Sequence, residues 1–442
     1  MPDGLRCDLL LTNARYLSPD MMVVSGKAIA VQDGRILDIV DQDACAYQAE
    51  TVLSGSHLLW MPGLVDGHLH TSQQLLRGRL LDEKPVIWKR VNVPFESRLD
   101  EESSRLSAEL AAMEMIACGT TGFVDAGGKY PEVYAGVYQE AGLRGRLSVM
   151  TNDNPFCPQS LRAASVPAAV ERLRAMRDAL SGLLKPIYSV TTPTAVSEEL
   201  LRAVFQAAAE DGVPVETHMN EYASEVTDFI ERYGKRPFVW LEEEGLLAAP
   251  MTAPHCIFLS QEEMKIMARR QVRVAHCPFS NCGKGVPPAP QLLAAGVPVG
   301  LGTDGSAHGG LDLFREMRLF RGVMNVTRGV GTADSSIMPA ETLLAMATRG
   351  GGAALMEPGL GVIETGAPAD LIALNTDAPH LWPTQNLVHT LVESASGADV
   401  QHSIVNGKLL MQNRELLTID RERVRREAER LFEKQPWLRE WK

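Results

Sequence analysis

Residues 62–78 read PGLVDGHLHTSQQLLRG and place two histidines one residue apart at the end of an apolar run. In a β-strand, residues i and i+2 point to the same face, so the imidazoles of His68 and His70 could converge on one ion. The pair alone is also typical of an ordinary strand end, because only a cluster of several ligand types identifies a metal site. The interpretation of this stretch therefore depends on the strands that follow it.

Short apolar strands and segments of helical periodicity alternate through the middle of the chain, and several of these segments end at a glycine suited to a helix C-cap. The eight expected strands are LLWMPGLVDGHLH, TGFVDAGG, GRLSVMTND, PIYSVTTP, VPVETHMNE, MTAPHCIFL, VRVAHCP and VPVGLGTDG. Eight such units predict an α/β protein with a closed (β/α)₈ TIM barrel, whose active site lies at the C-terminal strand ends.

Both ends of the chain have a different pattern, with short β-type runs separated by turns such as Asp33-Gly34 and Asn406-Gly407. We expect residues 1–58 and 365–442 to form one small, β-sandwich-like domain, and residues 59–364 to form the barrel. The mixed charge and helical spacing of the last twenty or so residues predict a surface helix.

The composition argues against two classes of partner. The chain of 442 residues has 43 Lys and Arg against 55 Asp and Glu, a net charge of -12. Such a surface does not favour nucleic acid or anionic membranes. The N-terminus resembles no signal peptide, no stretch is typical of a transmembrane helix, and the seven cysteines form no regular framework. These features predict a cytoplasmic protein.

Polar residues gather at the predicted C-terminal strand ends. They are His68 and His70 on the first strand, His218 on the fifth, His255 on the sixth, His276 on the seventh and Asp304 on the eighth. Five of the ten histidines in the chain thus occur at these positions. Three neutral imidazoles and one carboxylate suit a divalent transition metal such as zinc or iron, with one position left for water.

Glu221 follows His218 by three residues, where a carboxylate can transfer protons beside a metal without binding it. The alternative is that Glu221 caps the next helix. We expect His276 to be a hydrogen-bonding neighbour of the ligands. His308 either faces the substrate or is solvated, and the sequence leaves both interpretations open. Asp125 ends the second strand without an obvious partner.

The ordered motifs PGLVDGHLH, MEMIACGTTGFVD, ETHMNE, PHCIFLS, HCPFSN and LGTDG resemble the amidohydrolase superfamily. The resemblance is to its cytoplasmic aminohydrolase branch, which includes S-adenosylhomocysteine and methylthioadenosine deaminases, guanine and 8-oxoguanine deaminases and triazine hydrolases. It implies that His68, His70, His218 and Asp304 bind one divalent metal. Zn²⁺ is the expected ion, and Fe²⁺ and Mn²⁺ are the alternatives. The resemblance also implies catalytic roles for Glu221, His255 and Asp304, and a homodimer. The fourth strand has no lysine to bridge a second metal.

Two departures from the adenosylhomocysteine enzymes concern the substrate. Thr191 stands where those enzymes have a histidine that touches the sugar, and SAHGGLD replaces their Ser-Asn-Asn run. Both changes argue against a ribose-bearing substrate. Gln73 and Trp88 resemble substrate contacts of the triazine enzymes, and an indole can stack on a flat ring. The alternative for Trp88 is packing under the loop.

The sequence therefore predicts a metal-dependent hydrolase of C–N bonds other than peptide bonds. The expected reaction releases ammonia from a small nitrogen heteroaromatic ring such as a purine, pterin or triazine. Gln73, Trp88, Thr191 and His308 are the expected substrate contacts. One alternative keeps the site but changes the leaving group to chloride, an alkylamine or a cyclic amide nitrogen. The other alternative is a barrel that has lost catalysis and serves as a scaffold.

Overall fold

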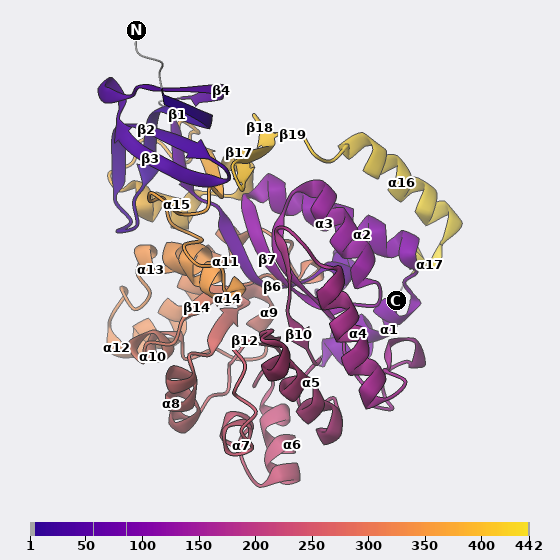
Figure 1. Cartoon of the computed structure of the whole chain (residues 1–442). Helices are drawn as coiled ribbons and strands as arrows, with labels where there is room; N and C mark the ends of the chain where they lie inside the picture. The colour runs from indigo at the N-terminus through magenta and orange to yellow at the C-terminus, as the bar shows by residue number, and fades with distance from the viewer. Residues whose placement is uncertain (1–4, 56, 85, 441–442) are drawn as a thin grey trace.

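The barrel is formed by two arcs of parallel strands in a computed structural model that describes residues 5–55, 57–84 and 86–440 (Figure 1). One arc has the order β15-β6-β7-β8-β9 and the other β10-β11-β12-β13-β14. The strands are β6 (Leu64–His70), β7 (Thr120–Gly128), β8 (Arg144–Val149), β9 (Leu184–Pro186), β10 (Tyr188–Ser189), β11 (Val215–Glu216), β12 (Met251–Pro254), β13 (Arg273–His276), β14 (Val299–Leu301) and β15 (Asp304–Gly305). The arcs adjoin where the chain passes from β9 to β10 and from β14 to β15. The predicted barrel is confirmed.

Helices surround the barrel (Figure 1). They begin and end where the sequence supplies caps: Asp100 accepts a hydrogen bond from the backbone N–H of Ser103 at the start of α2, and Gly119 ends α2 with φ +83°. The helices of the barrel region are α1 (Val93–Arg98), α2 (Glu101–Cys118), α3 (Pro131–Ala141), α4 (Val166–Ala179), α5 (Glu198–Asp211), α6 (Ala223–Tyr233), α7 (Pro237–Glu243), α8 (Gln261–Arg270), α9 (Pro278–Asn281), α10 (Ala289–Ala294), α11 (Leu313–Met324), α12 (Val330–Thr332), α13 (Ala340–Ala345) and α14 (Gly351–Leu355). No helix among the described residues is both long enough and apolar enough to span a bilayer.

Strands from both ends of the chain join in one mixed sheet, next to the barrel (Figure 1). The members are β1 (Leu5–Leu17), β2 (Val23–Gln32), β3 (Arg35–Asp41), β4 (Tyr47–Ser54), β5 (Leu58–Pro62), β16 (Leu371–Asn375), β17 (Val400–Val405), β18 (Lys408–Gln412) and β19 (Glu415–Leu416). The central contact is the antiparallel pair β5 and β16, in which Trp60 lies opposite Ala373. The exact boundaries of this composite domain stay a prediction.

The expected turns and the C-terminal helix are also present. Asp33 and Gly34 join β2 to β3, and Asn406 and Gly407 join β17 to β18, all with positive φ. Near the C-terminus lie α15 (Leu387–Ser394), α16 (Arg421–Lys434) and α17 (Trp437–Glu440). Helix α16 packs on α2, where Arg423 forms an ion pair with Glu109.

The run Gly350-Gly351-Gly352 brings a helical segment against the barrel strands that carry the predicted ligands. A Cβ on Gly351 would lie 2.2 Å from the carbonyl oxygen of Val65, and a Cβ on Gly350 would lie 2.4 Å from that of Val299. Both distances are shorter than any normal contact. Only glycine therefore permits this approach to β6 and β14.

Candidate metal centre and active site

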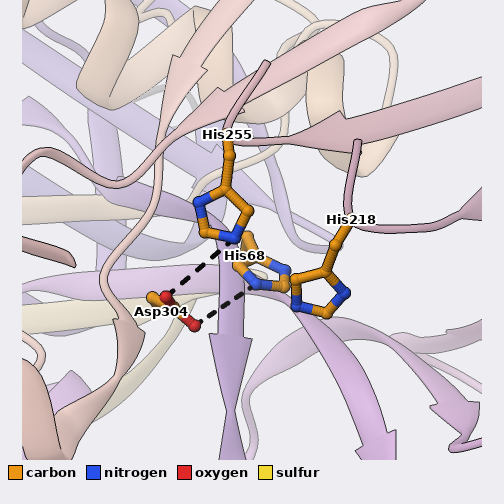
Figure 2. A group of neighbouring side chains, drawn as sticks. All are labelled: His68, His218, His255 and Asp304. Carbon is orange, nitrogen blue, oxygen red and sulfur yellow. Dashed lines mark ion pairs between the residues drawn. The ribbon is translucent and has the colours of Figure 1, made fainter. Parts of the chain in front are cut away.

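Four side chains at the C-terminal end of the barrel form a compact cluster of metal-binding atoms (Figure 2). One ligand atom from each of His68, His218, His255 and Asp304 lies within 4.8 Å of the other three, and the described residues therefore contain a His₃Asp metal site. His68 projects from β6, and Asp304 begins β15 with φ +59°.

His70 lies at the same centre. Its Nε2 is 3.2 Å from Nε2 of His218 and 3.2 Å from Oδ1 of Asp304. Nε2 of His255, in contrast, is 4.0 Å from Oδ2 of Asp304 and 3.8 Å from Oε1 of Glu221. Both histidines are therefore candidates for the third imidazole ligand, and the predicted set with His70 stays a prediction.

The chemistry of the cluster fits a divalent cation. Nε2 of His255 is buried without a hydrogen-bond partner among the described residues, and a bound cation would satisfy such an atom. Burial lowers the pKa of His68, but the carboxylates of Glu216 and Asp304 outweigh it and raise that pKa to about 10. The same negative charge that attracts a proton would attract a metal ion.

His218, His255 and Asp304 have the protonation states that ligands require. Burial lowers the pKa of His218 and of His255 well below the usual range, so both imidazoles are neutral. Burial raises the pKa of Asp304, but hydrogen bonds from His68 and His70 outweigh this and hold that pKa well below its usual range. Asp304 is therefore an ionised carboxylate.

Hydrogen bonds to Nδ1 turn Nε2 of His68, His218 and His255 toward the centre, whereas Nδ1 of His70 is buried without a hydrogen-bond partner among the described residues. Nδ1 of His68 donates to Oε1 of Glu216 at 2.5 Å, and Nδ1 of His218 donates to the carbonyl oxygen of Thr191 at 2.6 Å. Nδ1 of His255 forms a hydrogen bond with the side-chain amide of Asn281 at 3.0 Å. Glu216 was not predicted from the sequence; it is the last residue of β11, and His218 follows two residues later, beyond the end of that strand.

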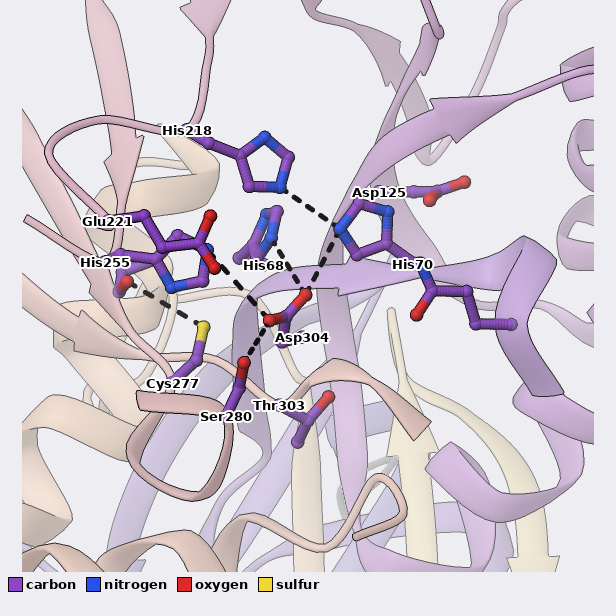
Figure 3. Close-up of polar contacts among 12 residues, drawn as sticks. His68, His70, Asp125, His218, Glu221, His255, Cys277, Ser280, Thr303 and Asp304 are labelled. Carbon is purple, nitrogen blue, oxygen red and sulfur yellow. Dashed lines mark hydrogen bonds and ion pairs between the residues drawn. The ribbon is translucent and has the colours of Figure 1, made fainter. Parts of the chain in front are cut away.

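Glu221 lies beside the cluster and does not cap a helix (Figure 3). Helix α6 begins after Tyr222, and Oε2 of Glu225 accepts hydrogen bonds from the backbone N–H groups of Glu221 and Tyr222. Tyr222 is the N-cap of α6 and Glu225 bonds back to it from the third helical position, so Glu221 lies before the capping position. The carboxylate of Glu221 contacts Lys284, whose Nζ donates to Oε1 at 2.5 Å.

Asp125 has a hydrogen-bond partner near the cluster, whereas His276 has none among the described residues. Asp125 has a partner that the sequence did not reveal, because its Oδ2 accepts a hydrogen bond from Oγ1 of Thr71 at 3.0 Å. The ring of His276 packs edge-on against Phe320, and burial lowers its pKa to about 3. Neither ring nitrogen of His276 has a hydrogen-bond partner among the described residues, so its expected role stays a prediction.

A cavity next to the cluster contains all four predicted substrate contacts in its lining, namely Gln73, Trp88, Thr191 and His308. The ring of Trp88 also packs edge-on against Phe156, so it contributes to local packing as well. Glu96, which was not predicted from the sequence, lies in the same cavity wall. Its Oε1 accepts hydrogen bonds from Nε2 of Gln73 and Oγ of Ser72, both at 2.9 Å, while Oε2 is buried and has no hydrogen-bond partner in the described part of the chain.

Glu316 on α11 should make stability depend on pH. Burial raises the pKa of Glu316 from 4.5 to about 8. Between these values the folded chain keeps a proton that the unfolded chain has lost, so this group's contribution to stability falls as pH rises. The slope approaches about 1.4 kcal/mol per pH unit. Urea unfolding from pH 5 to 8 should show a flatter profile for Glu316→Gln, and parallel profiles for the two proteins would contradict the prediction.

Comparison with known proteins identifies the class. A model of the amidohydrolase family matches residues 59–410, and the chain belongs to this family. A 5-methylthioadenosine/S-adenosylhomocysteine deaminase of Haloarcula marismortui is 34% identical over 426 residues, which cover 95% of this chain and 96% of the relative. A 5′-deoxyadenosine deaminase of Methanosarcina barkeri is 33% identical and covers 96% and 98%. The crystal structure of an adenosine deaminase from Xanthomonas campestris with bound zinc has a TM-score of 0.88, 27% identity and coverage of 98% and 99%.

Proposed function

We propose that this chain is a zinc-dependent aminohydrolase that removes the amino group of an adenine nucleoside modified at its 5′ carbon. The observation that carries the proposal is similarity over nearly the full length to deaminases of such nucleosides, together with an intact His₃Asp cluster. The prediction of a metal-dependent deaminase is confirmed by the full-length similarity to deaminases. The intact cluster also argues against the alternative of a non-catalytic scaffold.

His68, His70, His218 and Asp304 would hold the zinc ion. When bound, the ion lowers the pKa of a water molecule and stabilises negative charge near the reacting carbon. Asp304 accepts a proton from the attacking water, and Glu221 carries a proton to the ring nitrogen beside that carbon. His255 stabilises the charge that develops on the water-derived oxygen. The C–N bond to the amino group then breaks, and water plus aminopurine yields oxopurine plus ammonia.

The relatives change the expectation for the sugar. Thr191 and the loop SAHGGLD argue against ribose, yet the full-length relatives are named as deaminases of adenine nucleosides. Glu96 supports a sugar in this cavity, because its free Oε2 can accept a hydrogen bond from a ribose hydroxyl. Trp88 would stack on the base, while Gln73 holds Glu96 in place and His308 lines the same cavity.

A panel of substrates tests the proposal. Zinc-loaded protein should release ammonia from 5′-deoxyadenosine, 5′-methylthioadenosine or S-adenosylhomocysteine with a kcat/KM about 10²-fold or more above that for free adenine, because the sugar contacts contribute binding energy. Guanine, a pterin and an aminotriazine serve as the comparison rings, and chloride and alkylamine release are measured in parallel. Turnover of a free base or a triazine, with none of the nucleosides, would overturn the proposed substrate class.

The assembly and location are further parts of the proposal. A homodimer and a cytoplasmic location stay predictions, and light scattering on the purified protein tests the first. Nucleic acid is not expected to bind, given the net charge of -12.

A further inference from the structure

Lys284 lies between the two carboxylates that the proposed reaction uses. It belongs to the loop between α9 and α10, and its side chain is only 7% exposed. Its Nζ donates to Oε1 of Glu221 at 2.5 Å and to Oγ of Ser280 at 2.7 Å, and it is 3.9 Å from Oδ2 of Asp304. Ser280 in turn donates to Oδ2 of Asp304 (Figure 3). One cation thus connects the two acids.

These contacts offset the unfavourable burial of a lysine. Burial lowers the pKa of Lys284, but the negative charges of Glu221 and Asp304 outweigh it and raise that pKa. The ammonium group is therefore fixed in its charged form, and it lowers the repulsion between two neighbouring carboxylates.

The two carboxylate oxygens of Glu221 differ in their contacts. Lys284 occupies Oε1, and Oε2 of Glu221 has no hydrogen bond among the described residues. The backbone N–H of Glu221 is fixed separately by Glu225. Glu221 and Lys284 both line the cavity beside the metal cluster. One oxygen of Glu221 is thus anchored, while the other is free to exchange a proton with a bound ring.

We propose that Lys284 is a positioning residue for deamination, which holds Glu221 in the orientation that delivers a proton to the ring nitrogen. The inference rests on the proposed function, because it needs Glu221 as the proton carrier. If Lys284 acts through Glu221, removing the lysine side chain lowers kcat and leaves KM and the zinc content nearly unchanged. Misplacing a reacting group by about 1 Å costs about 10²-fold in rate.

A double-mutant cycle tests the inference. Lys284→Met, Lys284→Arg, Glu221→Gln and the double variant Lys284→Met/Glu221→Gln are compared with wild type, all zinc-loaded, on the nucleoside that wild type turns over fastest. We expect Lys284→Met to lose about 10²-fold in kcat. Lys284→Arg should recover part of this loss. In the Glu221→Gln background, Lys284→Met should cost no more than about 2-fold, because two residues that act as one unit are not additive.

The matched control is Lys129→Met. Nζ of Lys129 donates to the carbonyl oxygens of Ser97 and Leu99, so its removal tests the loss of a partly buried lysine outside the proton path. We expect kcat within about 3-fold of wild type, since its contacts are the two backbone carbonyls and the ring of Tyr130, none of which belongs to the proposed proton path. Circular dichroism and zinc analysis check folding, and Lys284→Gln replaces Lys284→Met in the cycle if the methionine variant fails to fold.

Each outcome has a distinct meaning. If Lys284→Met costs the same factor with and without Glu221, Lys284 acts through the fold or the metal site, and the inference is wrong. Wild-type kcat in Lys284→Met would also overturn it. If wild type deaminates no nucleoside, the proposed function fails instead. The cycle is then run on the ring that wild type does turn over, which judges Lys284 separately.

Discussion

Replacing Glu221 by glutamine should lower kcat by about 10²- to 10⁴-fold, the usual contribution of a positioned proton-transfer group. Glutamine keeps the size of the side chain and a carbonyl oxygen that can accept the hydrogen bond from Nζ of Lys284. It cannot carry a proton between water and the ring. Because Glu221 is not among the proposed ligands, zinc content should stay at the wild-type level.

Steady-state kinetics and metal analysis of the same preparation measure both quantities. Glu262→Gln, a substitution in the exposed first turn of α8, removes the same charge away from the cavity and should leave kcat unchanged. A Glu221→Gln enzyme with wild-type kcat would remove Glu221 from the mechanism. Loss of zinc together with activity would instead assign Glu221 a part in holding the metal.

Replacing His70 should lower the zinc affinity far more than replacing His255. Nε2 of His70 lies 3.2 Å from both Asp304 and His218, whereas Nε2 of His255 is 4.0 Å from Asp304 and close to Glu221. His70→Asn should therefore lower zinc affinity by more than the about 10- to 100-fold that is typical of removing a neighbour of a ligand. His255→Asn should keep zinc and lose about 10²- to 10³-fold in kcat, as expected for a group that stabilises an oxyanion.

Equilibrium dialysis against a zinc buffer gives the affinities, and kinetics at saturating zinc gives kcat. His389→Asn is a suitable control, because His389 is an exposed histidine on α15, far along the chain from the cluster. The opposite pattern, with zinc lost from His255→Asn and retained by His70→Asn, would assign His255 to the ligand set in place of His70.

The barrel and the convergence of its polar side chains were predictable because they follow from local patterns. Each strand is predicted by an apolar run in the sequence. Parallel strands in a barrel bring their C-terminal ends together regardless of the loop conformations. His68, His218 and Asp304 are far apart in sequence, yet their positions at strand ends were enough to place them at one centre. The same logic explains why the hairpins with Asn-Gly and Asp-Gly were found.

The residues that were missed act through pairs that no local pattern reveals. Lys284 lies in a glycine-rich loop, where neither strand nor helix periodicity fixes the direction of a side chain. Glu96 follows a long connection, so its approach to Gln73 depends on how that loop folds. The substrate is harder to predict from the sequence, because the argument against ribose depended on Thr191 and one loop, whereas the proposed nucleoside is supported by full-length relatives and by Glu96 in the cavity wall.

The sheet built from both ends of the chain imposes an order on folding during synthesis. Strand β5 leads directly into β6 and the first two histidines, but its antiparallel partner β16 is made only after the whole barrel. Until then one edge of β5 has no strand to bind, and unpaired edges attract other chains. Closing this edge should be among the last steps of folding. A ribosome-bound chain that stops before Leu371 would then contain every proposed zinc ligand and still expose a surface prone to aggregation.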